Sequence, residues 1–217
     1  MTGLKAKVEN LWYHYKFRII LGLFLLFALC VLLYSCITKP TADLQVFYVT
    51  GNSPVYQEQL DVLAAALTHY AEDADGNNRV EISLKHYYIG DGTSANELIT
   101  SNRSQLMTSL QAGYCMLVIA DETGMQYLNS SGILDDLTEI VPETALDGRG
   151  WKINGSGFAA EQEALEVFDH TIYFGLRVFD GTVISLNKKM QETYAVARDL
   201  LHRVASVSLP ATTEEGK

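Results

Sequence analysis

The segment Cys115-Met116-Leu117-Val118-Ile119-Ala120 is a continuous apolar run that lies between Gly113 and Asp121. A run of this length without a polar position is typical of a strand that is covered on both faces. We therefore expect it to be the central and most buried strand of a sheet, with another parallel strand on each side. Cys115 is then expected to be a buried, inert thiol, because apolar surroundings raise the pKa of a thiol.

Segments typical of strands and helices alternate on both sides of this run. Branched and aromatic residues indicate strands, and apolar residues at helical spacing indicate helices. We expect Ser53-Pro54 to begin one helix, and the S-x-x-E capping box at Ser94 to Glu97 to begin another. The expected elements are strand 44–49, helix 54–72, strand 80–88, helix 94–113, strand 115–120, helix 122–129, strand 171–179 and helix 187–205. This order predicts a parallel sheet with helices packed on it.

An apolar segment precedes this domain. Residues 19–38 are twenty residues without a charge, and as a helix they would reach about 30 Å, the thickness of the hydrocarbon core of a bilayer. The alternative is a buried core helix, but the segment has no polar stripe that could face water. We expect a single transmembrane helix. The fold class is therefore α/β, with an N-terminal transmembrane helix followed by a mainly parallel sheet with helices on both faces.

The charge distribution predicts the orientation of this helix. Residues 1–18 carry a net charge of +3, and the chain after Lys39 carries −14. By the positive-inside rule the head is cytoplasmic and the rest is extracellular, at the cell membrane. The same acidity makes nucleic acid an unsuitable partner. The expected organisation is a head (1–18), a transmembrane helix (19–38), a tether (39–43), an extracellular α/β domain (44–208) and a flexible tail (209–217).

We expect the segment to remain as an uncleaved signal anchor, because the head is long for a secretory signal and no A-x-A-like cleavage site precedes the domain. Leu33-Tyr34-Ser35-Cys36 offers the alternative, since it resembles a bacterial lipoprotein cleavage box. Lipidation at Cys36 would tether the same domain to the same face of the membrane.

The sequence shows no catalytic constellation, so we expect neither an enzyme nor a cofactor. His69, His86, His170 and His202 lack the spacing of metal ligands. Asp73, Asp75 and Asn77 begin like a calcium loop, but Asn78 replaces the glycine of the sharp turn and Leu84 the closing glutamate. A polar turn between helix and strand explains the same residues, so we expect no metal site there.

Ligands of open parallel sheets bind beyond the carboxyl ends of the strands. The alternative is that the polar residues at these ends are only turn and capping residues. The candidate ligand-binding residues at these ends are Thr50, Asn52, Ser53, Asp91, Thr93 and Asp121.

Several of these segments carry a resemblance to a known family. They are Leu44 to Val49, the helix after Ser53-Pro54, the Asp-x-Asp-Gly-Asn turn, Leu106 to Asp121 and Gly132 to Thr138. Together they resemble one lobe of an extracellular solute-binding protein. With the head Leu11 to Phe17, the chain also looks like uncharacterised single-pass membrane proteins of Gram-positive anaerobic bacteria. The resemblance implies a single lobe, because about 178 residues after the span leave no room for two full lobes.

Two functions follow as expectations. The first is a membrane-anchored extracellular binding or sensing module, non-catalytic, for a small solute or a peptide. The second is a structural or assembly protein of the cell envelope that docks another protein and has no small-molecule site. The lipid bilayer is the partner of residues 19–38 in both.

Overall fold

The structure is a computed structural model, and it divides into two compact units, residues 1–41 and 42–217. The residues that it describes are 15–18, 20–32, 42–51, 55–73, 76–92, 96–141, 143–162, 165 and 168–208. The predicted tail and Cys36 lie outside these residues.

The first unit contains an apolar helix over Tyr15–Leu32, with a mean hydropathy of 2.1 and none of its length buried. At about 1.5 Å per residue, its 18 residues are long and apolar enough to cross a membrane, as a signal sequence also is. Within the described residues it is the one helix with this property. It begins four residues before the predicted start of the span, and residues 33–38 lie outside the described part.

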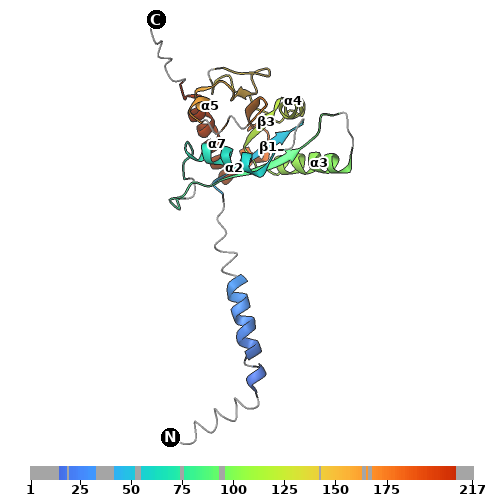
Figure 1. The fold of residues 1–217 in the computed structure, drawn as a ribbon, viewed down its shortest axis with the longest axis vertical. Helices are drawn as coiled ribbons and strands as arrows, with labels where there is room; N and C mark the ends of the chain where they lie inside the picture. Colours follow the sequence, from blue (N-terminus) through green and yellow to red (C-terminus); the bar gives the residue numbers. More distant parts are fainter. Residues whose placement is uncertain are drawn as a thin grey trace, which may run out of the picture. The chain divides into compact units, whose positions relative to one another are not determined.

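The second unit is built on one five-stranded sheet with the strand order β2-β1-β3-β5-β4. Figure 1 labels two of its strands, β1 and β3. The strands are β1 (Leu44–Thr50), β2 (Ile82–Tyr88), β3 (Leu117–Asp121), β4 (Trp151–Lys152) and β5 (Ile172–Leu176). β2, β1 and β3 are parallel, and β5 runs antiparallel to both β3 and β4. The expected α/β class with a mostly parallel core is confirmed.

β3 is the central strand, and all five of its residues are buried. The prediction that both of its neighbours are parallel is wrong, because β5 returns to it directly in the antiparallel direction. Cys115 precedes the strand, and its thiol donates a hydrogen bond to the carbonyl oxygen of Leu117 at 2.9 Å. Burial raises the pKa of Cys115 to about 12, so the thiol is protonated at neutral pH.

Helices cover both faces of the sheet, as the sequence predicts. The helices are α2 (Gln57–Thr68), α3 (Glu97–Gln111), α4 (Glu122–Ser130), α5 (Gly157–Glu161), α6 (Val183–Leu186) and α7 (Lys188–Ala205). Side chains alternate along β1: Val46 and Tyr48 pack in the cluster that holds the apolar residues of α2 and α7. Phe47 and Val49 pack in the cluster that holds those of α3 and α4. This alternation is the period of a strand buried on both faces.

The helix ends differ from the predicted ones. The N-cap of α2 is Tyr56, and its backbone N–H donates to the side chain of Gln59 at 3.0 Å. The N-cap of α3 is Asn96, whose side chain accepts from the backbone N–H of Ile99 at 2.8 Å. Asparagine is a favoured N-cap residue, because its side chain accepts from a free N–H group of the first turn. Ser53 and Ser94 lie outside the described residues.

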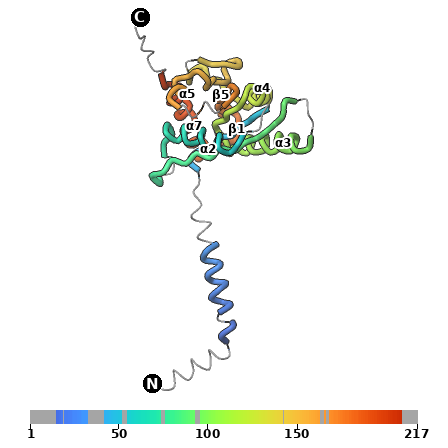
Figure 2. The backbone as a smooth tube through the Cα atoms, in the orientation of Figure 1, coloured from blue at the N-terminus to red at the C-terminus, as the bar shows by residue number. Residues whose placement is uncertain are grey.

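The chain between α4 and β5 forms the loops of the yellow-to-orange trace in Figure 2. Its elements β4 and α5 were not predicted. β4 adds to the sheet edge through Trp151, whose ring stacks on that of Phe174 with centroids 5.8 Å apart. β4 has only two residues, so it is too short to show the alternation of apolar and polar residues that predicts a strand.

The polar turn before β2 is held by Asp73. Its carboxylate accepts hydrogen bonds from the backbone N–H groups of Gly76 at 2.7 Å and Asn78 at 2.6 Å. Asn78 adopts φ +62°, a left-handed conformation that asparagine tolerates. The side chain of Asn77 accepts from the N–H of Arg79 at 2.7 Å, and Asp75 lies outside the described residues. These bonds are those of the predicted helix-to-strand turn.

Candidate functional site

The carboxyl ends of β1 and β3 lie side by side, because the two strands are parallel neighbours. The helix that follows β1 packs on one face of the sheet, and the helix that follows β3 packs on the other. This is the topological switch point, where open α/β sheets form ligand crevices. Thr50 and Asp121, two of the predicted ligand residues, are therefore brought together at this edge.

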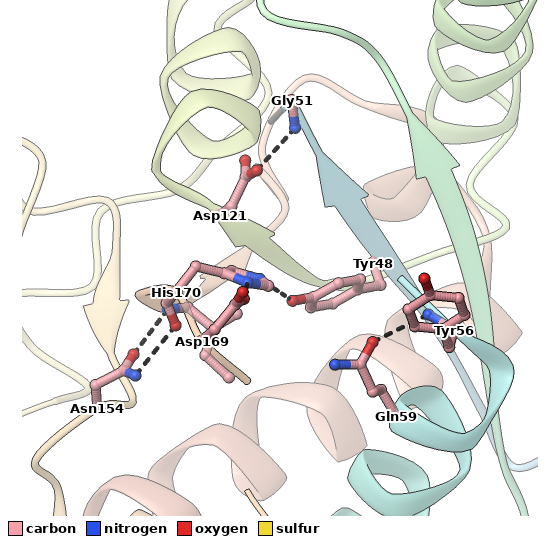
Figure 3. A network of polar contacts seen from close by, with 9 residues as sticks. Tyr48, Gly51, Tyr56, Gln59, Asp121, Asn154, Asp169 and His170 are labelled. Atoms are coloured by element: carbon pink, nitrogen blue, oxygen red, sulfur yellow. Dashed lines mark hydrogen bonds and ion pairs between the residues drawn. The ribbon is translucent and has the colours of Figure 1, made fainter. Parts of the chain in front are cut away.

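Asp121 connects the two strands at this edge (Figure 3). One carboxylate oxygen accepts from the backbone N–H of Gly51 at 2.9 Å, and the other accepts from that of Gly124 at 2.7 Å. The second bond makes Asp121 the N-cap of α4, where a negative charge also complements the helix dipole. The side chain is only 4% exposed. Its geometry holds β1, β3 and α4 together.

Two glycines allow the end of β1 and the first turn of α4 to touch. A Cβ atom at Gly124 would lie 2.5 Å from the carbonyl oxygen of Val49. A Cβ atom at Gly51 would lie 2.3 Å from the side chain of Thr123. Larger residues do not fit at either position, so the chain itself fills the space between β1 and α4.

Thr50 is fully buried, and its hydroxyl lies 2.8 Å from Nε2 of His86 on the neighbouring strand. Burial lowers the pKa of His86, and the negative charge of Asp121 partly opposes this effect. The neutral form of His86 is therefore favoured. The pair joins β1 to β2 through side chains as well as through backbone hydrogen bonds.

A chain of hydrogen bonds extends from β1 to the segment before β5 (Figure 3). The hydroxyl of Tyr48 lies 2.8 Å from Nε2 of His170, and Nδ1 of His170 lies 2.9 Å from the carboxylate of Asp169. Burial raises the pKa of Tyr48 strongly, with smaller contributions from Asp121 and Asp169, so the phenol keeps its proton. The hydrogen bond to His170 lowers the pKa of Asp169.

The Asp169 carboxylate can only accept, so Nδ1–H of His170 donates to it. In the neutral imidazole, Nε2 then accepts from the Tyr48 hydroxyl. Asn154 holds the backbone of the segment before β5. Its side chain accepts from the N–H of Ile172 at 2.7 Å and donates to the carbonyl of His170 at 3.2 Å. Tyr48 is 0% exposed and cannot reach a substrate, so the arrangement positions this segment on β1.

The other predicted ligand residues are not brought into this cluster by the described structure. Asp91 is exposed after β2. Asn52, Ser53 and Thr93 lie outside the described residues. Ligand binding at these strand ends stays a prediction.

A groove lies away from this edge, between α7 and the segment 135–140. Its volume is about 1010 Å³. The lining residues are Asp135, Asp136, Thr138, Glu139, Ile140, Phe179, Gln191, Tyr194, Ala195, Arg198, Asp199 and His202. Apolar and aromatic residues form part of the wall, and charged residues of both signs, with acids in excess, form the rest.

Tyr194 anchors the wall of this groove. Its hydroxyl donates to the carboxylate of Asp135 at 2.9 Å, and its ring lies against that of Phe179 with centroids 4.9 Å apart. Burial, and then the bond to Asp135, raise the pKa of Tyr194, so this hydroxyl keeps its proton. Asp136 is held in turn by Thr138, whose backbone N–H and hydroxyl donate to it at 2.8 Å and 2.7 Å. These bonds lower the pKa of Asp136.

The sequence did not predict this groove. Helical spacing places Tyr194 on the apolar face of α7 with Ala197, Leu201 and Val204, and its ring packs against the core. The partner Asp135 is 59 residues away, and helical spacing does not reveal a contact over that distance. The available signal was the pair Arg198 and His202, which follow Tyr194 by four and eight residues and line the same groove.

Within the described residues, no group of three or more His, Cys, Asp or Glu side chains is placed to hold a metal ion. The comparisons with protein-family models, with curated proteins and with solved structures found no match.

Proposed function

We propose that the protein is a membrane-anchored, non-catalytic binding module whose α/β domain lies outside the cell. The apolar helix Tyr15–Leu32 supports the membrane anchoring in this proposal. The basic head and the acidic chain after Lys39 support the orientation, because positive charges remain on the cytoplasmic side of a span. The order of β2, β1 and β3, with helices on both faces, supports the resemblance to one lobe of a solute-binding protein.

The observation that carries the binding role is the groove along α7. Ligand sites are commonly hollows of about 300–1,000 Å³ in which a few polar groups stand among apolar ones, and the groove is of this size and kind. At the strand ends, by contrast, Thr50 and Asp121 are buried and already hydrogen-bonded. A ligand there would have to replace bonds that hold the fold. The groove is therefore the preferred site for a small solute or part of a peptide.

A melting experiment on the full chain in detergent tests this site. We expect at least one member of a panel of amino acids, sugars and short peptides to raise the melting temperature, because a ligand that binds only the folded state stabilises it. We expect Arg198→Ala, in the groove wall, to reduce the rise. Arg79→Ala, which removes an equally exposed arginine from the turn before β2, is the matched control and keeps it.

Two outcomes would contradict the groove as the ligand site. A rise that survives Arg198→Ala but disappears on Asp91→Ala would move the site to the carboxyl edge of the sheet. No rise with any member of the panel would contradict a small-ligand site and favour the alternative of a cell-envelope assembly protein.

The proposed orientation is tested by labelling reporter cysteines in intact cells with a membrane-impermeant maleimide. In a Cys30→Ser and Cys36→Ser background, we expect a cysteine at Lys217 to react and one at Thr2 to be protected until the cells are lysed. Cys115 is buried and does not compete for the reagent. The opposite pattern would show that the domain is cytoplasmic.

A further inference from the structure

Three large apolar side chains are exposed at one corner of the α/β domain. They are Tyr114 with 65% of its surface exposed, Val183 with 41% and Leu186 with 86%. The segment before β3 lies beside α6, because a Cβ atom at Gly113 would lie 3.2 Å from the side chain of Val183 and 2.9 Å from that of Met190. Tyr114 follows Gly113 directly, and Leu186 ends the short helix α6 that Val183 begins. Exposed apolar groups that gather in this way indicate an interaction surface.

This corner belongs to the amino edge of the sheet. Tyr114 comes shortly before β3, which pairs in parallel with β1. β1 begins at Leu44, and the backbone N–H of Asp43 donates to the carbonyl of Glu81 at 2.8 Å, just before β2 begins. The chain therefore enters the domain at the same edge that carries the exposed apolar residues.

The length of chain before this edge is short. Nine residues, 33–41, separate the end of the apolar helix at Leu32 from the first described residue of the domain, Ala42. Even fully extended, they span at most about 35 Å. Because the connection is short, the effective concentration of the membrane surface is high at the edge where the chain enters the domain. A weak contact is then sufficient to hold this edge at the membrane.

The charges next to the corner suit a lipid surface. Lys188 and Lys189 follow Leu186 after one residue and are exposed, and no other two lysine or arginine residues are adjacent in the sequence after Lys39. Lys188 lies 3.9 Å from the exposed Glu192, a weak pair that water screens. Lysines beside apolar residues can place their aliphatic stems against the lipid while their ammonium groups contact anionic headgroups. Tyrosine also favours the headgroup layer.

We propose that this amino-edge corner, Tyr114, Val183 and Leu186 with Lys188 and Lys189, contacts the surface of the membrane that anchors the chain. The apolar side chains enter the headgroup layer, and the two lysines bind anionic lipid headgroups. This contact rests on the proposed anchoring by the N-terminal helix. It orients the opposite, carboxyl edge of the sheet away from the lipid.

The test uses the full chain reconstituted into vesicles of phosphatidylcholine, with or without phosphatidylglycerol. In a Cys30→Ser and Cys36→Ser background, an environment-sensitive dye is attached at Leu186→Cys. Leu98→Cys is the matched control, because Leu98 is a leucine with 66% exposure at the start of α3, which follows the carboxyl end of β2. Lipids that carry a quencher are expected to quench the dye several-fold more at position 186 than at position 98.

The role of the lysines has its own readout. We expect the double variant Lys188→Glu and Lys189→Glu to reduce quenching at position 186, and we expect this reduction only in vesicles that contain phosphatidylglycerol. Equal quenching at positions 186 and 98 would overturn the proposal. So would a dye at position 186 that is shielded in proportion to protein concentration and not quenched by lipid, because a second copy of the chain would then cover the corner.

Flotation of the same vesicles after a carbonate wash separates this inference from the proposed anchoring. A chain that does not float with the vesicles contradicts the anchor itself. A chain that floats but shows no selective quenching at position 186 contradicts only the lipid contact of the corner.

Discussion

Replacing Val118 with lysine is expected to destabilise the folded α/β domain by about 3–5 kcal/mol. Val118 is 0% exposed at the centre of β3, and it lies opposite Phe47 on one side and Gly175 on the other. An uncompensated buried charge costs about 3–5 kcal/mol, a large part of the 5–15 kcal/mol that stabilises a typical domain. Lysine is a stricter choice than aspartate, because it cannot pair with the buried guanidinium of Arg177, whose Nη1 has no hydrogen-bond partner within the described residues.

The measurement is urea unfolding of the full chain in detergent, followed by the circular dichroism of the domain. Ser83→Lys is the matched control, because Ser83 is an exposed position on β2 in the same sheet. A lysine there should change the free energy of unfolding by no more than about 0.5 kcal/mol. If Val118→Lys left the unfolding midpoint at the wild-type value, β3 would not be the centre of the core.

The elements that sequence periodicity predicts best are the ones buried on one or both faces. The apolar run at β3 and the alternating residues of β1 are explained by burial alone, and so both strands were found within two residues of their ends. α7 was also placed correctly, because its buried residues Tyr194, Ala197, Leu201 and Val204 repeat at helical spacing. Local sequence is sufficient to predict an element whose side chains face the core at a regular spacing. This spacing is every second residue in a strand and every third or fourth residue in a helix.

The direction of a strand in the sheet is not a local property. β5 was predicted as a strand, but nothing in its residues distinguishes a parallel from an antiparallel partner. Its direction follows from the loops between α4 and β5, where β4 and the five-residue α5 are too short to show a period. The stack of Trp151 on Phe174 that holds β4 joins residues far apart in the chain.

The same dependence on tertiary contacts explains which features of the candidate sites could be predicted from the sequence. The general rule for parallel sheets correctly places Thr50 and Asp121 at one edge, because it depends only on the order of the strands. It does not show that both side chains are buried and bonded within the fold. The groove along α7 depends on the approach of Asp135 to Tyr194, and the bond from Tyr48 to His170 spans 122 residues. Such contacts exist only once the tertiary structure is formed.

Asp121→Ala is expected to destabilise the domain by about 2–4 kcal/mol. The substitution leaves the buried backbone N–H groups of Gly51 and Gly124 without their acceptor. An unsatisfied buried donor costs about 1–3 kcal/mol, and the lost N-cap of α4 accounts for part of this cost. Asp121→Asn retains one side-chain oxygen and should therefore lose about half as much. The measurement is again the free energy of unfolding in urea.

The matched control is Glu122→Ala, which removes a neighbouring carboxylate from the first turn of the same helix. Glu122 is exposed, and the hydrogen bond that its carboxylate accepts from the Gln126 side chain is long, at 3.4 Å. Removing this carboxylate should therefore cost a few tenths of a kcal/mol at most. The decisive comparison is the order Asp121→Ala, then Asp121→Asn, then Glu122→Ala in decreasing cost. If Asp121→Ala cost no more than Glu122→Ala, the hydrogen bonds of Asp121 would not be what holds β1 to α4.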